Sequence, residues 1–140
     1  MRHRIRITFQ KWRMSNKSRG EWAELQFAAD ARKYGWDVFI PFGDDCDFDM
    51  IITKQAIVLT IQVKSTYTDL NGTSKWNIGK GHDCKQRYND DVDWFALWDD
   101  TIKHWRFFRP SNTNGVKTFR VKQTNTKNLE NWNDLENDDD

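Results

Sequence analysis

Two apolar, β-branched runs separated by a short polar connection constrain the fold of this chain most strongly. The runs occupy residues 48–52 and 57–64, and the polar connection occupies residues 53–56. β-Branched residues favour strands, and a connection of this kind between two strand-like runs is typical of a hairpin turn. The sequence therefore predicts a β-hairpin.

The polar residues of the predicted hairpin indicate a site. A two-residue loop at positions 54–55 places Asp49 directly across from Thr60. Side chains alternate along a strand with a period of two, so Gln62 and Lys64 share a face with Asp49. An acid, an amide and an ammonium group are costly to bury without partners. We predict a functional site on this face; the alternative is a simple Asp49–Lys64 ion pair.

A helix is predicted before the hairpin. Ser18 and Glu21 have the spacing of a capping box, with Ser18 as the N-cap. Apolar residues then recur at helical spacing up to Gly35, which is predicted to end the helix. Glu21 has a structural role at the cap, whereas Glu24 lies one turn later among packing residues. We therefore expect Glu24 to be the functional acid; an exposed helix charge is the alternative.

The remaining elements predict an α/β domain. We expect strands at 36–40, 73–78, 94–98 and 105–108, a short helix near 83–89, and a turn-rich loop at 42–47. The acids Asp44, Asp45 and Asp47 are interpreted as part of a solvated loop, not as metal ligands. The predicted fold is a central mixed sheet of about four or five strands flanked by helices.

The order of these motifs resembles that of the PD-(D/E)XK nuclease superfamily, over roughly residues 17–110. Asp49 matches the acid that opens one hairpin strand, and Gln62, Val63 and Lys64 match the acid-x-Lys triplet on the next, with Gln replacing the acid. The preceding helix usually supplies a Glu, here Glu24. The Gln variant is most similar to homing endonucleases of group I introns, and the helix start is similar to archaeal Holliday-junction resolvases. No Pro precedes Asp49, which is a second departure.

The resemblance implies a restriction-endonuclease-like core (αβββαβ) and an Mg²⁺-dependent endodeoxyribonuclease in which Mn²⁺ can substitute. The implied catalytic residues are Glu24, Asp49, Gln62 and Lys64. The implied metal ligands are Asp49, the Gln62 oxygen, the Val63 carbonyl and Glu24, in keeping with the oxygen ligands that Mg²⁺ prefers. Lys64 is expected to orient the attacking water or to stabilise the phosphate oxygens.

Homing-type or phage-type double-strand cleavage is the leading hypothesis for the activity. A Holliday-junction resolvase is the second, and a catalytically inactive DNA-binding module on the same fold is the third. The expected partner is double-stranded or branched DNA, bound by a homodimer or homotetramer because two strands need two active sites. The candidate DNA contacts are Arg13, Lys17, Arg19, Ser65, Lys80 and Lys85.

Charged residues are distributed unevenly along the chain, although its formal net charge is only +1. Charged residues up to position 19 are all basic, and those from position 128 onward are all acidic. We therefore expect a basic arm at 1–17, which suits a phosphate backbone, a nuclease-like domain at 18–122, and an acidic, poorly ordered tail at 123–140. Trp12, Trp76 and Trp132 lie in polar stretches and are expected to pack at the surface; base stacking is the alternative.

The sequence also predicts a compartment. No apolar run has the length of a membrane span, and the N-terminus lacks the apolar core of a signal peptide. Cys46 and Cys84 are too few for a disulfide framework. We expect a cytoplasmic protein without a membrane partner, and an origin in a phage or an intron is compatible with this.

Overall fold

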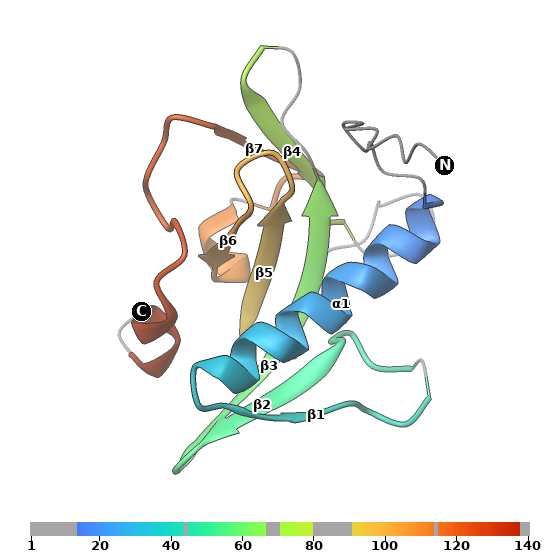
Figure 1. Cartoon of the computed structure of the whole chain (residues 1–140), viewed down its shortest axis with the longest axis vertical. Coiled ribbons are helices and arrows are strands. Elements are labelled where there is room, and N and C mark those ends of the chain that lie inside the picture. Colours follow the sequence, from blue (N-terminus) through green and yellow to red (C-terminus); the bar gives the residue numbers. More distant parts are fainter. Residues whose placement is uncertain (1–13, 44, 67–70, 80–90, 114, 138–140) are drawn as a thin grey trace, which may run out of the picture.

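The chain folds around a five-stranded mixed sheet with one long helix across it (Figure 1). The computed structural model describes residues 14–43, 45–66, 71–79, 91–113 and 115–137. The helix is α1 (Asn16–Lys33). The sheet has the order β1 (Asp37–Phe39), β2 (Met50–Lys54), β3 (Ile57–Thr66), β5 (Trp94–Asp99), β6 (His104–Phe108). β3 and β5 are parallel and the other neighbours are antiparallel, so the predicted mixed α/β sheet is confirmed.

The predicted hairpin is present, but its turn is one residue later than expected. Lys54 pairs with Ile57, so the loop consists of residues 55–56 rather than 54–55. Met50 consequently pairs with Ile61, and the predicted placement of Asp49 across from Thr60 is wrong. The register moves by two residues, and side-chain direction has a period of two. The side chains of β3 therefore alternate as predicted. Asp49, however, lies beside a part of β3 that is two residues further along the strand than predicted.

The helix begins earlier than predicted and ends where predicted. Ser15 is the N-cap, since its side-chain oxygen accepts a hydrogen bond from the Ser18 amide at 3.2 Å. Ser18 therefore lies inside the helix, and the predicted capping box is wrong. At the other end Gly35 has a φ of 89°, and the Trp36 amide donates to the Ala31 carbonyl at 3.0 Å. This is the Schellman arrangement that a glycine at this position favours.

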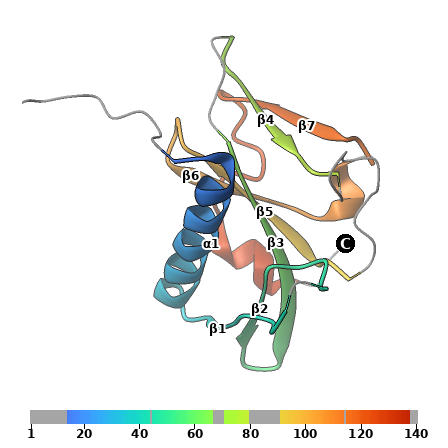
Figure 2. The same cartoon turned by 90° about the vertical axis from the view of Figure 1, so that its right-hand side faces the viewer.

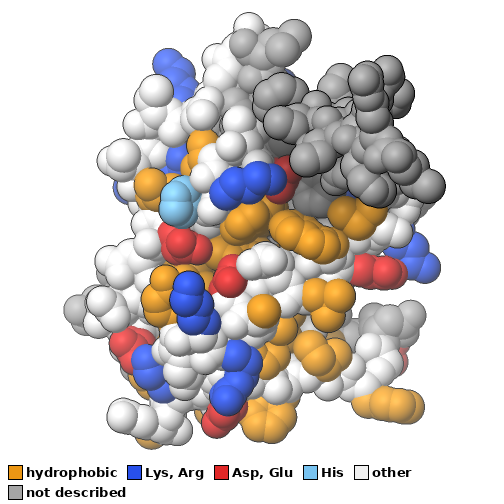
Figure 3. Space-filling view, viewed as in Figure 1, with side chains coloured by type: hydrophobic (Ala, Val, Ile, Leu, Met, Phe, Trp, Pro, Cys, Tyr) orange, Lys and Arg blue, Asp and Glu red, His pale blue; other side chains and the backbone are white. Residues whose placement is uncertain are grey.

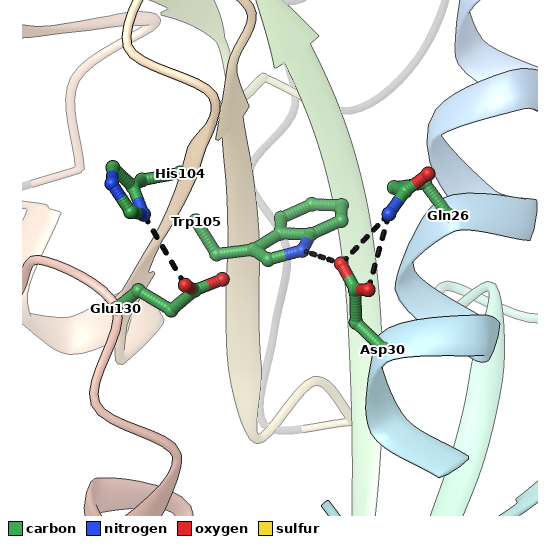
Figure 4. A network of polar contacts seen from close by, with 5 residues as sticks. All are labelled: Gln26, Asp30, His104, Trp105 and Glu130. Carbon is green, nitrogen blue, oxygen red and sulfur yellow. Dashed lines mark hydrogen bonds and ion pairs between the residues drawn. The ribbon is translucent and has the colours of Figure 1, made fainter. Parts of the chain in front are cut away.

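An aromatic core lies between α1 and the sheet. Phe27 of α1 is fully buried and makes edge contacts with Trp105 and Phe107 of β6. The Trp105 indole N–H donates to Asp30 at 2.8 Å, and the Gln26 amide donates to the same carboxylate (Figure 4). Packing and hydrogen bonds together fix α1 on the sheet, and they thereby fix the position of any functional group on this helix.

The C-terminal segment is part of this core. Trp132 lies in the short 3-10 helix η2 (Trp132–Glu136), is 6% exposed, and stacks on Tyr34 and Phe27 with ring centroids 4.9 and 5.4 Å apart. Leu135 is also buried. The expectation of a poorly ordered tail is therefore wrong up to residue 137, and Trp132 is not a surface side chain. Residues 138–140 lie outside the described part of the chain.

A second, two-stranded sheet packs on the opposite face (Figure 2). It pairs β4 (Thr73–Asn77) with β7 (Thr118–Lys122), a strand that the sequence did not predict; the short 3-10 helix η1 (Pro110–Thr113) follows β6. The expectation that residues 73–78 join the main sheet is wrong. Trp76 is buried between the two sheets, which corrects its predicted surface position. The predicted helix near 83–89 lies outside the described residues.

The surface on the α1 side mixes apolar side chains with charges of both signs (Figure 3). The exposed large hydrophobic residues include Leu25 at 72% and Phe42 at 107%. None of the helices in the described ranges is long and apolar enough to cross a membrane.

Candidate active site

An open cavity of about 520 Å³ lies where the first half of α1 meets the end of β3 and the strand β4. Its lining brings together residues from four separate segments of the chain. They are Asn16, Arg19, Gly20, Glu24, Asp49, Gln62, Val63, Lys64, Ser65, Thr66, Lys75 and Asn77. The predicted catalytic residues Glu24, Asp49, Gln62 and Lys64 are all among them.

Asp49 is held by the backbone of β3. It lies immediately before β2, and its amide donates to the Ile61 carbonyl at 2.8 Å. Its carboxylate accepts a hydrogen bond from the Val63 amide, also at 2.8 Å. The carboxylate is thereby fixed beside the Gln62–Lys64 triplet.

Glu24 approaches the same carboxylate from α1. The pKa of Glu24 is raised to about 8, chiefly by burial and then by the negative charge of Asp49 and a hydrogen bond to that carboxylate. Lys64 opposes the shift. Near pH 7 Glu24 is therefore mainly protonated, and its carboxyl group donates a hydrogen bond to the Asp49 carboxylate.

The pKa of Asp49 is also raised, chiefly by burial. The Val63 amide, the hydrogen bond from Glu24 and the charge of Lys64 act against this rise. The two carboxyl groups thus form one unit that retains a proton in place of a second negative charge. An Asp49–Lys64 ion pair alone does not account for this arrangement, because the carboxylate of Asp49 is hydrogen-bonded to Glu24.

Glu24 rather than Glu21 lies at the site, as predicted. The helix-capping role predicted for Glu21 is wrong. Glu21 is exposed in the second turn of α1 and does not cap the helix, which starts three residues earlier than predicted. Glu24 is half-buried because the following turns of α1 pack against the sheet.

Gln62 lies on β3, is 8% exposed and lines the cavity. Its position in the lining of the cavity makes it available to a ligand there.

The donor set fits a hard divalent cation. No group of three His, Cys, Asp or Glu side chains suited to a metal occurs within the ranges that the structure describes. The cavity does combine two neighbouring carboxyl groups with the Gln62 amide and the Val63 backbone. One or two carboxylates together with neutral oxygens suffice for Mg²⁺, which keeps several waters.

The predicted DNA contacts divide into three groups. Arg19 and Ser65 line the cavity, whereas Lys17 is exposed on α1 outside its lining. Arg13, Lys80 and Lys85 lie outside the described residues. Asp45 and Asp47 do not line the cavity, and Asp44 lies outside the described residues.

The sequence did not identify Lys75 and Asn77 as part of this lining. They were missed because β4 was assigned to the main sheet. The signal that could have found them is the alternation of 73–77, in which Ser74 and Trp76 are buried and Lys75 and Asn77 are exposed.

Comparison with known proteins identifies the fold and the family of this chain. A comparison with curated proteins finds no match. Among solved structures, the bacterial homing endonuclease I-Ssp6803I is similar, with a TM-score of 0.66 and 23% identity over 79% of this chain and 78% of that one. The Holliday junction resolvase Hjc of Archaeoglobus fulgidus is also similar, with a TM-score of 0.51 and 17% identity over 76% of this chain and 85% of that one.

These two likenesses show a shared fold. The comparison with protein families shows the family as well as the fold. The family described as PD-(D/E)XK endonuclease matches residues 14–134 of this chain. That range includes α1, both sheets and every residue that lines the cavity. The chain therefore belongs to the PD-(D/E)XK endonuclease family.

Proposed function

We propose that this protein is a metal-dependent DNA endonuclease that hydrolyses phosphodiester bonds at the α1–β3 cavity. The observation that carries the proposal is the pair of hydrogen-bonded carboxyl groups, Glu24 and Asp49, beside Gln62 and Lys64. Like-charged groups this close and partly buried are unfavourable without a cation. A divalent metal compensates their charge and replaces the proton.

Mg²⁺ is the proposed cofactor, and Mn²⁺ can substitute. Asp49 and the Gln62 side-chain oxygen would hold the ion, with Glu24 and the Val63 carbonyl as further ligands. When bound, the ion supplies Lewis-acid stabilisation of charge on phosphate oxygens and eases deprotonation of water.

The protein side chains then have separate tasks. Glu24, once deprotonated, orients the attacking water by accepting a hydrogen bond from it. Lys64 lines the same cavity and donates hydrogen bonds to the phosphate oxygens, where negative charge grows. Gln62 brings one negative charge fewer than an acid would. Its neutrality weakens metal binding but eases the approach of the anionic backbone, which favours chemistry with one metal ion.

Site-specific double-strand cleavage of the homing or phage type is the proposed activity. The support is the Gln variant of the triplet and the similarity to I-Ssp6803I. A junction resolvase is the second candidate because the fold is also similar to Hjc. Either activity acts on two strands, so we propose a homodimer or homotetramer that presents two cavities.

A cleavage assay with defined DNA forms tests this proposal. The full-length protein is incubated with supercoiled plasmid, linear duplex and a four-way junction, each with Mg²⁺, Mn²⁺, Ca²⁺ or EDTA. We expect Mg²⁺-dependent cleavage, with double-strand breaks in duplexes that carry the target; paired nicks confined to the junction would support the resolvase. DNA binding without cleavage of any form in Mg²⁺ or Mn²⁺ would instead establish an inactive binding module.

A further inference from the structure

We propose that the outward face of the β4–β7 sheet, here called the basic ribbon, binds the phosphate backbone of duplex DNA beside the cavity. This inference rests on the proposed nuclease function and assigns a new contact surface to it. The surface is separate from the contacts predicted on α1 and β3.

Alternation along the two strands creates the basic ribbon. Ser74, Trp76 and Val121 are buried and face the main sheet. The intervening residues of both strands point outward and include no acid. They are Thr73, Lys75, Asn77, Thr118, Arg120 and Lys122.

The strand register concentrates positive charge on this face. Lys75 pairs directly with Arg120, and Thr73 pairs with Lys122. A run of phosphates along a DNA strand matches a run of cations on a sheet.

The ribbon continues directly from the cavity. Lys75 and Asn77 line the same cavity as Glu24 and Lys64. Arg120 lies on the next strand, about 4.8 Å further away in an antiparallel pair. Cations thus extend from Lys64 through Lys75 to β7, so a DNA strand with its scissile phosphate in the cavity would place its next phosphates over the ribbon.

The ribbon is also firmly anchored. The Ser74 hydroxyl donates to the buried Asp99 carboxylate, and the Trp76 indole N–H donates to the Trp98 carbonyl at 3.0 Å. Both acceptors lie at the end of β5. A contact surface fixed in this way stays at a constant distance from the cavity. It also binds DNA without the entropic cost of ordering a loop.

The double variant Arg120→Gln/Lys122→Gln tests the inference, because both side chains are exposed and neither lines the cavity. The control is Lys33→Gln/Lys103→Gln, which removes two exposed cations beside another cavity, at the C-terminal end of α1. Binding to a labelled duplex is measured in Ca²⁺ from low to moderate salt. Two lost phosphate contacts make the slope of log K against log salt shallower by about 1.8 units. The control variant is expected to keep the wild-type slope.

The outcomes separate this inference from the proposed function. Wild-type protein that cleaves DNA, combined with equal salt slopes for both double variants, would overturn the basic ribbon and leave the nuclease proposal standing. Wild-type protein that neither binds nor cleaves DNA would overturn both. Circular dichroism of the variants checks the fold, and Arg120→Lys/Lys122→Arg, which keeps both charges, should restore the wild-type slope.

Discussion

At the scale of single residues, Glu24 makes the stability of the metal-free protein depend on pH. Its pKa is 4.5 in the unfolded chain and about 8 in the fold, so the folded state binds more protons between these values. Because the folded state binds more protons than the unfolded state, the free energy of unfolding decreases as the pH rises through this range. In EDTA, the free energy of unfolding of the wild type should therefore decline from pH 5.5 to pH 8.5 more steeply than that of Glu24→Gln.

Glu21→Gln is the comparison variant, because Glu21 is an exposed glutamate of the same helix whose charge raises the pKa of Glu24 less than burial and Asp49 do. Urea denaturation of the three proteins at both pH values measures the difference. A Glu24→Gln variant with the same pH dependence as the wild type and Glu21→Gln would contradict the shared proton.

Gln62 gives a second residue-scale prediction. If its oxygen is a ligand, Gln62→Glu should bind Mg²⁺ more tightly and keep some activity, whereas Gln62→Ala should lose activity. Calorimetric Mg²⁺ titration and cleavage rates measure both effects. Equal behaviour of the two variants would show that Gln62 serves only in packing.

Several site residues could be predicted because the signals were local. Asp49, Gln62 and Lys64 were placed near one another by the period of two, and a register error of two residues did not disturb this alternation. Glu24 was identified partly through an N-cap that proved wrong. Lys75 was missed because its position depends on the pairing of β4 with a distant strand.

At the scale of elements, the C-terminal segment stabilises the fold. Trp132 stacks on both Tyr34 and Phe27 and is 6% exposed. Trp132→Ala should lower the free energy of unfolding by about 3–5 kcal/mol. Leu25→Ala, which truncates a side chain that is 72% exposed on α1, should change it by less than about 0.5 kcal/mol. Similar values for the two variants in chemical denaturation would refute the role of this segment.

Local signals also explain which elements were predicted. The hairpin and the end of α1 at Gly35 follow from short-range turn and capping chemistry. β7 and the packing of Trp132 follow from contacts with residues far away in sequence. Nothing in the polar composition around Trp132 indicates such contacts, so the segment resembled a solvated tail.

At the scale of the whole molecule, the architecture serves to bring four segments to one cavity. α1 is fixed to β6 through Asp30 and Trp105, and β4 is fixed to β5 through Ser74 and Asp99. The cavity lies between these two anchored elements, at the end of β3. The family and the mixed sheet could be predicted from motif order, whereas the arrangement of the second sheet required the three-dimensional structure.

The most direct test of the central claim is the single-turnover cleavage rate of Asp49→Ala and of Lys64→Ala in Mg²⁺. The structure provides two controls outside the cavity, Asp45→Ala in the exposed loop and Lys33→Gln at the end of α1. We predict that each cavity variant remains folded, binds DNA and loses at least ~100-fold in rate, while both controls cleave at the wild-type rate. Wild-type rates in Asp49→Ala and Lys64→Ala would contradict the assignment of this cavity as the active site.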